Sequence, residues 1–229
     1  MATGSVSLSD TDKEKASQIV EASQRLVSIG MNRGSCGNIS VRSETTFKGS
    51  DRFLVTPSGI DPEKMTPESI CLMNMSGETV EGGKPSSEWR MHRDIYDARP
   101  EIHAVVHTHS PFATTLACMQ LEVPPFHYMI AVTGGNTIPC APYALFGSQE
   151  LSDSALVCLE NRYACLLAHH GMLALGHNLE HSMAIAIEVE SLCEQYWRIL
   201  QTGHLKILSE KQMNAVHEKF RDYFKKTNQ

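Results

Sequence analysis

Two histidines one residue apart, His107 and His109, are of a type and spacing that could hold a metal ion. They lie in residues 104–109, where the apolar residues predict a β-strand. Because side chains alternate between the faces of a strand, both imidazoles are expected on one face, with Thr108 on the other. Two neutral imidazoles placed in this way suit Zn²⁺. Among 11 histidines in 229 residues such a pair also arises by chance, so a structural role stays open.

Two further candidates are ambiguous when each is taken singly. One member of the pair His169-His170 could complete a ligand set, or both could be ordinary histidines at a strand end. Glu88 could supply a carboxylate ligand, or it could lie in the first turn of a helix, where a negative charge stabilises the helix dipole by about 0.3–1 kcal/mol. Their positions in the sequence leave each alternative open.

Three loops of small residues could bind an anion. They are residues 34–38 (GSCGN), 57–59 (PSG) and 85–87 (PSS), and each offers backbone N–H groups. The last loop also precedes a predicted helix, whose positive N-terminal end attracts phosphate. Three ordinary turns and a helix cap are the alternative. The chain has no Walker or dinucleotide glycine pattern, which argues against ATP or NAD as its main ligand.

The elements that must position these residues are a mixture of strands and helices. A first helix over 12–29 would end at Gly30, and Pro100 must end the helix that begins near Ser86. Because strands and helices do not alternate regularly, the sequence predicts an α/β (α+β-like) fold, with a mostly antiparallel central β-sheet flanked by α-helices. Strands are expected over 38–41, 52–55, 70–75, 104–109, a region within 128–143 and a pair within 164–174, and further helices over 112–119, 148–161, 178–202 and the C-terminal segment.

Composition and charge narrow the function further. The 20 Lys and Arg against 26 Asp and Glu give a net charge of −6, which argues against a nucleic-acid or anionic-membrane partner held by bulk charge. A hydrophobic content of 41% predicts one globular domain over residues 1–229, with residues 1–8 flexible. The chain has neither a spanning apolar run nor a secretory h-region, and its seven scattered cysteines contain no C-x-x-C. These features predict a cytoplasmic protein with reduced cysteines.

Five motifs, read together, carry more information than any one of them. G-S-C-G-N-I-S, T-P-S-G, P-S-S-E-W-R-x-H, H-T-H and H-H-G follow one another along nearly the whole chain. Their order and spacing resemble the class II aldolase/adducin family. The resemblance implies the fold of that family and a metal-dependent aldolase that is a cyclic homotetramer, with active sites between subunits.

The same resemblance assigns roles to individual residues. One Zn²⁺ per subunit would be held by Glu88, His107, His109 and His170. Glu88 would also act as the catalytic base, and Tyr128 of an adjacent subunit would protonate the aldehyde oxygen in the condensation direction. Phe146 and Tyr223 would form an apolar wall for the aldehyde, Tyr223 closing the site from the C-terminal tail. The substrate phosphate would be bound by Ser35, Gly37, Asn38, Ser58, Gly59, Ser86 and Ser87.

The expected reaction is cleavage of L-fuculose 1-phosphate, or a closely related deoxyketose 1-phosphate, to dihydroxyacetone phosphate and L-lactaldehyde through an enediolate. Alternatives on the same fold are an aldolase or dehydratase for 5-deoxyribulose or methylthioribulose 1-phosphate, and a sugar-phosphate epimerase. Those epimerases usually have Asp where this chain has Glu88. A non-catalytic adducin-like scaffold is the alternative from another class, and the presence of all four ligand residues argues against it.

Overall fold

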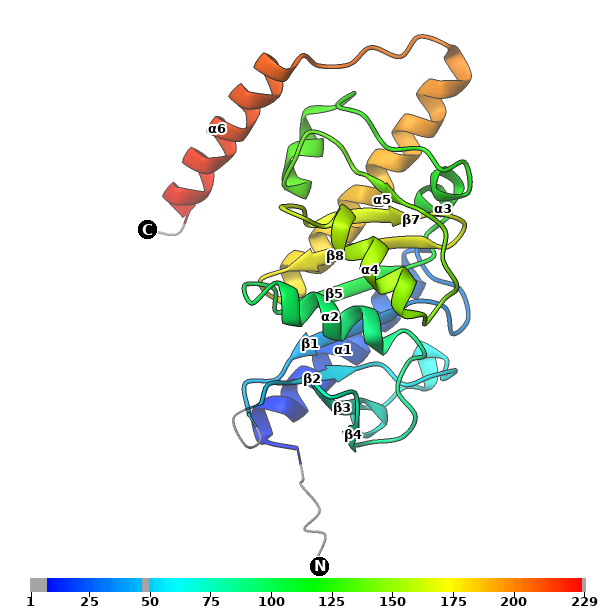
Figure 1. The fold of residues 1–229 in the computed structure, drawn as a ribbon, viewed down its shortest axis with the longest axis vertical. Coiled ribbons are helices and arrows are strands. Elements are labelled where there is room, and N and C mark those ends of the chain that lie inside the picture. The colour runs from blue at the N-terminus through cyan, green and yellow to red at the C-terminus, as the bar shows by residue number, and fades with distance from the viewer. Residues whose placement is uncertain (1–7, 47–49, 228–229) are drawn as a thin grey trace, which may run out of the picture.

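The computed structural model describes residues 8–46 and 50–227, and its centre is one eight-stranded β-sheet with the strand order β4-β3-β2-β1-β5-β8-β7-β6 (Figure 1). Adjacent strands are antiparallel except β6 and β7, which pair in parallel. The mostly antiparallel sheet predicted from the sequence is therefore confirmed. The strands are β1 (Asn38–Arg42), β2 (Arg52–Val55), β3 (Cys71–Asn74), β4 (Thr79–Glu81), β5 (Ala104–Thr108), β6 (Cys140–Ala141), β7 (Ala164–Leu167) and β8 (Gly171–Gly176).

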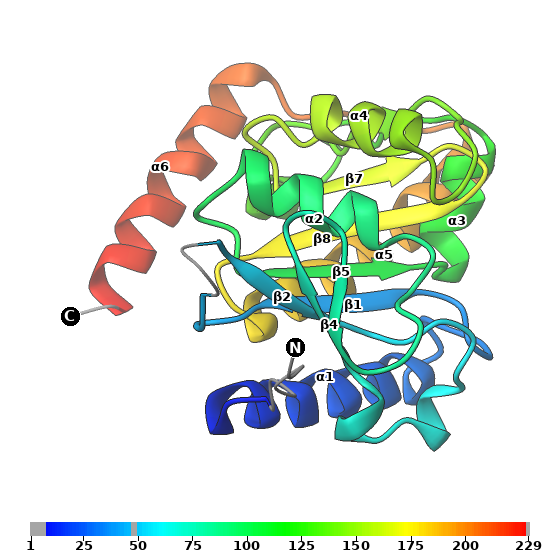
Figure 2. The ribbon, with the colours of Figure 1, turned by 60° about the horizontal axis from the view of Figure 1, so that its bottom comes forward.

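Helices cover both faces of this sheet (Figure 2). One hydrophobic core lies beneath α1, α3 and α5, and a second core lies beneath α2 and α4. Each strand of the centre therefore buries side chains on both faces, as Val105 and Val106 of β5 do in the two different cores. The helices are α1 (Asp10–Ser28), α2 (Trp89–Ala98), α3 (Pro111–Cys118), α4 (Gln149–Cys158), α5 (Leu179–Thr202) and α6 (Glu210–Thr227), with short 3₁₀ helices η1 (Pro62–Lys64), η2 (Pro67–Ser69) and η3 (Tyr128–Thr133).

The helix α6 projects beside the sheet at the end of an extended segment (Figure 1). It contacts the body at η3 and just beyond it: the ring of Phe220 stacks on Tyr128 with centroids 6.3 Å apart, and His217 hydrogen bonds to Asn136, three residues after η3. Among the described helices, none has both the length and the apolar character needed to cross a bilayer. The expectation that residues 1–8 are flexible concerns positions that lie, except for Leu8, outside the described residues.

The strand region expected within residues 128–143 is wrong. Residues 128–133 form the 3₁₀ helix η3, and only Cys140 and Ala141 form a strand. Pro139 and Pro142 flank this strand, and a proline has no N–H to give to a sheet, so β6 cannot extend in either direction. The strand β4 was not expected from the sequence, because its three residues are too few to show an alternating pattern.

Candidate active site

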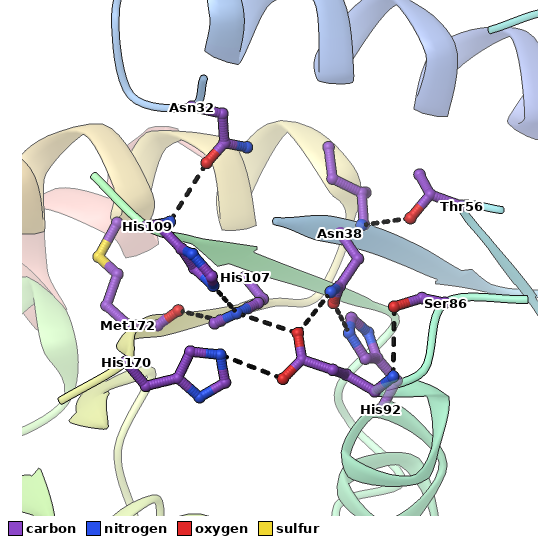
Figure 3. A network of polar contacts seen from close by, with 11 residues as sticks. Asn32, Asn38, Thr56, Ser86, His92, His107, His109, His170 and Met172 are labelled. Atoms are coloured by element: carbon purple, nitrogen blue, oxygen red, sulfur yellow. Dashed lines mark hydrogen bonds and ion pairs between the residues drawn. The ribbon is translucent and has the colours of Figure 1, made fainter. Parts of the chain in front are cut away.

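Four side chains that could bind a metal ion converge in the middle of the sheet, where β5 ends and β8 begins (Figure 3). His107 lies on β5 and His109 directly after it, His170 lies in the turn between β7 and β8, and Glu88 is the N-cap residue of α2. One potential ligand atom from each of the four residues lies within 4.8 Å of all the others. The sequence-predicted ligand set is thus brought together from three separate parts of the chain.

Hydrogen bonds orient these imidazoles toward a common centre. The Nδ1 of His107 donates to the carbonyl oxygen of Met172 at 2.8 Å, and a carbonyl can only accept. His107 therefore presents its Nε2, which lies 3.0 Å from the Nε2 of His109 and 3.2 Å from the Oε2 of Glu88. The Nε2 of His170 lies 3.2 Å from the Oε1 of Glu88. Backbone acceptors that fix a histidine in this way are a usual feature of metal sites.

The electrostatics of the cluster favour an ionised carboxylate. Burial acts to raise the pKa of the Glu88 carboxyl, but His107 and His170 outweigh it and hold this pKa well below its ordinary value. Burial and the two neighbouring histidines lower the pKa of His109 to about 4. Oε1 of Glu88 is buried and faces the imidazole of His170 at 3.2 Å. A buried carboxylate beside three imidazoles is a donor set that fits a divalent metal ion.

Local backbone structure holds the ligands in place. His169 adopts a left-handed conformation with φ of 55°, which turns the chain between β7 and β8 at the residue before His170. The backbone N–H of His109 donates to the side-chain oxygen of Asn32 at 3.2 Å. Ser110 directly follows His109, and its hydroxyl donates to the Glu190 carboxylate at 2.7 Å. This bond connects the start of α3 to α5.

The Glu88 carboxylate does not serve as a helix cap. Glu88 is the residue before α2, but its side chain makes no capping hydrogen bond and turns toward His107 and His170 instead. The helix begins at Trp89, slightly later than the sequence predicts. The helix-dipole interpretation of Glu88 therefore does not account for where its carboxylate lies.

The three small-residue loops meet beside this cluster. The N–H of Ser58 donates to the carbonyl of Lys84 at 2.9 Å, and the N–H of Ser86 donates to the carbonyl of Thr56 at 3.0 Å, so the second and third loops run side by side. The N–H of Thr56 in turn donates to Ile39 of β1 at 3.0 Å, which directly follows the first loop. The loops consequently face one space rather than three separate surfaces.

That space is a cleft of about 330 Å³, within the usual range for a small-molecule site. All seven residues predicted to bind phosphate line it, together with Glu88, His109 and His170. None of the described residues that line it is Lys or Arg. An anion in this cleft would therefore be held by hydroxyls, backbone N–H groups and the N-terminal end of α2.

Three further residues, Tyr128, Phe146 and Tyr223, were predicted to contact the aldehyde part of the substrate, and the structure places only Phe146 in the cleft. Phe146 lines the rim and its side chain is largely exposed. Tyr128 on η3 and Tyr223 on α6 are also largely exposed, and neither lines the cleft of its own chain. The prediction that these two tyrosines serve an adjacent subunit remains a prediction.

The cleft also contains residues that the sequence analysis did not select as site residues, namely Tyr143, Ala144 and His169. A buried chain of polar side chains behind Glu88 was missed as well, and it runs through His92 and Tyr96 of α2. A signal for it was present, because Glu88, His92 and Tyr96 are spaced by four residues and so share one helix face. The sequence analysis assigned neither His92 nor Tyr96 a role in the site.

The fold and the site together define a metal-dependent class II aldolase, which is a lyase. Residues 17–197 match the model of the class II aldolase and adducin N-terminal domain, and the chain belongs to that family.

Relatives support this membership over the whole fold. The chain is 47% identical to a 5-methylthioribulose-1-phosphate/5-deoxyribulose-1-phosphate aldolase of Rhodospirillum rubrum, over 90% of each chain. It is 43% identical to an L-fuculose phosphate aldolase of Escherichia coli K12, over 91% of this chain and 94% of the relative. A solved structure of an L-fuculose 1-phosphate aldolase superposes with a TM-score of 0.86 at 36% identity, covering 95% of this chain and 100% of the other.

Proposed function

We propose that the protein is a zinc-dependent aldolase that cleaves a deoxyketose 1-phosphate into dihydroxyacetone phosphate and a short aldehyde. The observation that carries this proposal is the position of the His₃/Glu cluster in one cleft with three loops of anion-binding donors. A phosphate in the loops would leave the ketose carbonyl within reach of the cluster. The names of the relatives, which are aldolases of ketose 1-phosphates, support the same chemistry.

Zinc would be held by Glu88, His107, His109 and His170, one ion in each subunit. When bound, the ion would supply Lewis-acid polarisation of the substrate's carbonyl oxygen, an effect that typically contributes several kcal/mol. The chain's own contribution is to orient the imidazoles, as the hydrogen bond from the Nδ1 of His107 to the Met172 carbonyl does.

Glu88 would transfer the proton at the carbon that becomes nucleophilic. Its ionised carboxylate can accept a proton, and the Asn38 amide donates to its Oε2 rather than to its Oε1. A base must lie within hydrogen-bond reach of the proton that it moves. The position of Glu88 directly after the phosphate-binding Ser86 and Ser87 supports this, because those two residues would anchor the adjacent part of the substrate.

The phosphate would be bound by Ser35, Gly37, Asn38, Ser58, Gly59, Ser86 and Ser87, and Phe146 would contact the aldehyde part from the rim. Tyr128 would donate a proton to the aldehyde oxygen during condensation and accept it during cleavage, reaching the site of an adjacent subunit in a homotetramer. Tyr223, on the C-terminal helix, would cover the same site. The exposure of both tyrosines on their own chain supports this arrangement.

Three substrates are the leading candidates. L-Fuculose 1-phosphate would yield L-lactaldehyde, which carries a hydroxyl next to its carbonyl, and the 43%-identical relative and the superposed structure favour it. 5-Deoxyribulose 1-phosphate and 5-methylthioribulose 1-phosphate would yield aldehydes that lack this hydroxyl, and the 47%-identical relative favours them. The three candidates share the dihydroxyacetone phosphate half and differ only in the aldehyde half.

A product assay on the three ketose 1-phosphates tests the proposal. We expect dihydroxyacetone phosphate from at least one of them, loss of activity after chelation, and recovery when Zn²⁺ is added to one equivalent per subunit. The ratio of kcat/KM values among the substrates identifies the preferred aldehyde. Full activity after complete metal removal, or borohydride trapping of substrate on a lysine, would overturn the metal-dependent mechanism in favour of imine chemistry.

A further inference from the structure

A chain of buried polar groups connects Glu88 to the interior of the protein. Asn38 and Ser40 of β1 face α2, and the Nδ2 of Asn38 donates to the Oε2 of Glu88 at 2.9 Å. The Nε2 of His92 contacts the Oδ1 of Asn38 (Figure 3). Beyond it, the Nδ1 of His92 lies 2.6 Å from the hydroxyl of Ser40, which lies 2.7 Å from the hydroxyl of Tyr96. His92 and Ser40 are fully buried.

The donor and the acceptor of each hydrogen bond in this chain can be assigned in turn, starting from the carboxylate of Glu88. An ionised carboxylate only accepts, so the amide nitrogen of Asn38 must face it and the amide oxygen must face His92. That oxygen also only accepts, so the Nε2 of His92 must carry a hydrogen. Because burial lowers the pKa of His92 to about 3, the ring is neutral and its Nδ1 accepts from Ser40. Ser40 has then used its hydrogen, and Tyr96 donates to it.

We propose that His92 is a positioning residue that locks the amide of Asn38 and, through it, the carboxylate of Glu88. The proposal rests on the proposed function, in which Glu88 is the catalytic base. If the amide of Asn38 turned over, its oxygen would face the carboxylate and repel it. With the amide locked, Oε2 of Glu88 accepts from Asn38, whereas Oε1 faces the imidazole of His170 at 3.2 Å. His92 thus determines which oxygen of Glu88 is available for the reaction.

Neutron diffraction from crystals of the zinc-loaded protein tests the hydrogen positions directly. We expect deuterium on the Nε2 of His92 and none on its Nδ1, and the amide nitrogen of Asn38 toward Glu88, since neutrons distinguish nitrogen from oxygen. Deuterium on the Nδ1 of His92, or the opposite amide orientation, would overturn the proposal. Because this result requires no substrate, it is separate from any failure of the ketose phosphate assay.

Kinetics test the positioning role. In His92→Phe we expect kcat for cleavage and for proton exchange on dihydroxyacetone phosphate to fall about 10–100-fold, with KM within about threefold and zinc content retained. His92→Gln, which can still donate to Asn38, should recover part of kcat. Ser152→Ala is the matched control. The buried Ser152 hydroxyl of α4 donates at 2.6 Å to Asp94, which lies on α2 as His92 does. This bond is not part of the chain of bonds to Glu88.

The comparison between these variants is decisive. Ser152→Ala should lower the melting temperature and leave kcat unchanged. If His92→Phe lost no more kcat than Ser152→Ala, or if His92→Gln recovered none of the loss, the positioning role would be refuted. Should His92→Phe fail to fold, the neutron result decides the question: the expected hydrogen positions support the proposal, and deuterium on the Nδ1 of His92 or the opposite amide orientation refutes it.

Discussion

At the scale of single residues, Glu88 combines two demands that usually conflict. A buried carboxylate is costly unless it is paired, and here His107, His170 and Asn38 surround it. A base must nevertheless be able to accept a proton. The arrangement meets both demands because Oε2 receives the amide donor, while Oε1 has only the imidazole of His170 as a neighbour among the described polar groups.

Replacing Glu88 by Gln tests this combination, because an amide cannot serve as a base. We expect proton exchange on dihydroxyacetone phosphate to fall by about 10²–10⁴-fold, measured by deuterium uptake in the zinc-loaded variant. Elemental analysis should show that the three histidines still retain the ion, and circular dichroism should show that the fold is unchanged. Exchange at the native rate would reduce Glu88 to a ligand or a structural residue.

At the scale of elements, the loop before β1 has to approach β5 closely. Gly37 adopts φ of 77°, and a Cβ atom there would lie 2.5 Å from the Nδ2 of Asn32 and 2.7 Å from the carbonyl oxygen of His107. Only glycine lets the loop pass so close to the metal cluster. The same loop contains Gly34, with φ of 58°, where a Cβ would meet nothing within 4 Å.

These two glycines form a matched pair for a test. Gly34→Ala should cost about 1–2 kcal/mol in the free energy of unfolding, from the left-handed backbone alone. Gly37→Ala should cost roughly 1–3 kcal/mol more because of the close contacts, and should raise KM for the phosphorylated substrate. Urea denaturation and steady-state kinetics measure the two effects. Equal stability losses in both variants would show that the close contacts at Gly37 cost nothing, and equal KM values would show that the close approach of this loop has no role in binding.

At the scale of the whole molecule, Tyr128 and Tyr223 lie outside the cleft of their own chain. Tyr128 is on η3, which contacts α5 and α6, whereas the metal cluster lies at the ends of β5, β7 and α2. A shared site between subunits therefore predicts that Tyr128 and Glu88 act together only when they come from different chains.

Mixing inactive subunits tests the shared site. Tyr128→Phe should lose cleavage by about 10²–10⁴-fold yet keep zinc and proton exchange, because aldehyde protonation is not needed to enolise dihydroxyacetone phosphate. Mixed with Glu88→Gln subunits, it should regain part of the cleavage activity, since some sites then contain both native residues. Absence of recovery, with subunit exchange verified by mass spectrometry, would place Tyr128 outside the site of a neighbouring chain.

Strand alternation predicted that His107 and His109 share one face, because the period of a strand is a local property of the sequence. Most helices followed in the same way, because caps, prolines and apolar periodicity act over a few residues. Glu88, His170 and the loop residues were predicted through the resemblance of five motifs to the class II aldolase/adducin family, since the position of each taken singly left its role open.

How Glu88 is held follows from tertiary contacts. Asn38 and His92 are 54 residues apart, and their hydrogen bond exists because β1 lies against α2, where Ser40 also bonds to His92 and Tyr96. The short strand β6 likewise depends on its parallel pairing with β7. Its two residues lie between prolines, and no local pattern predicts them as a strand. Strand pairing and buried polar contacts join distant residues, so their energies do not appear in any short window of sequence.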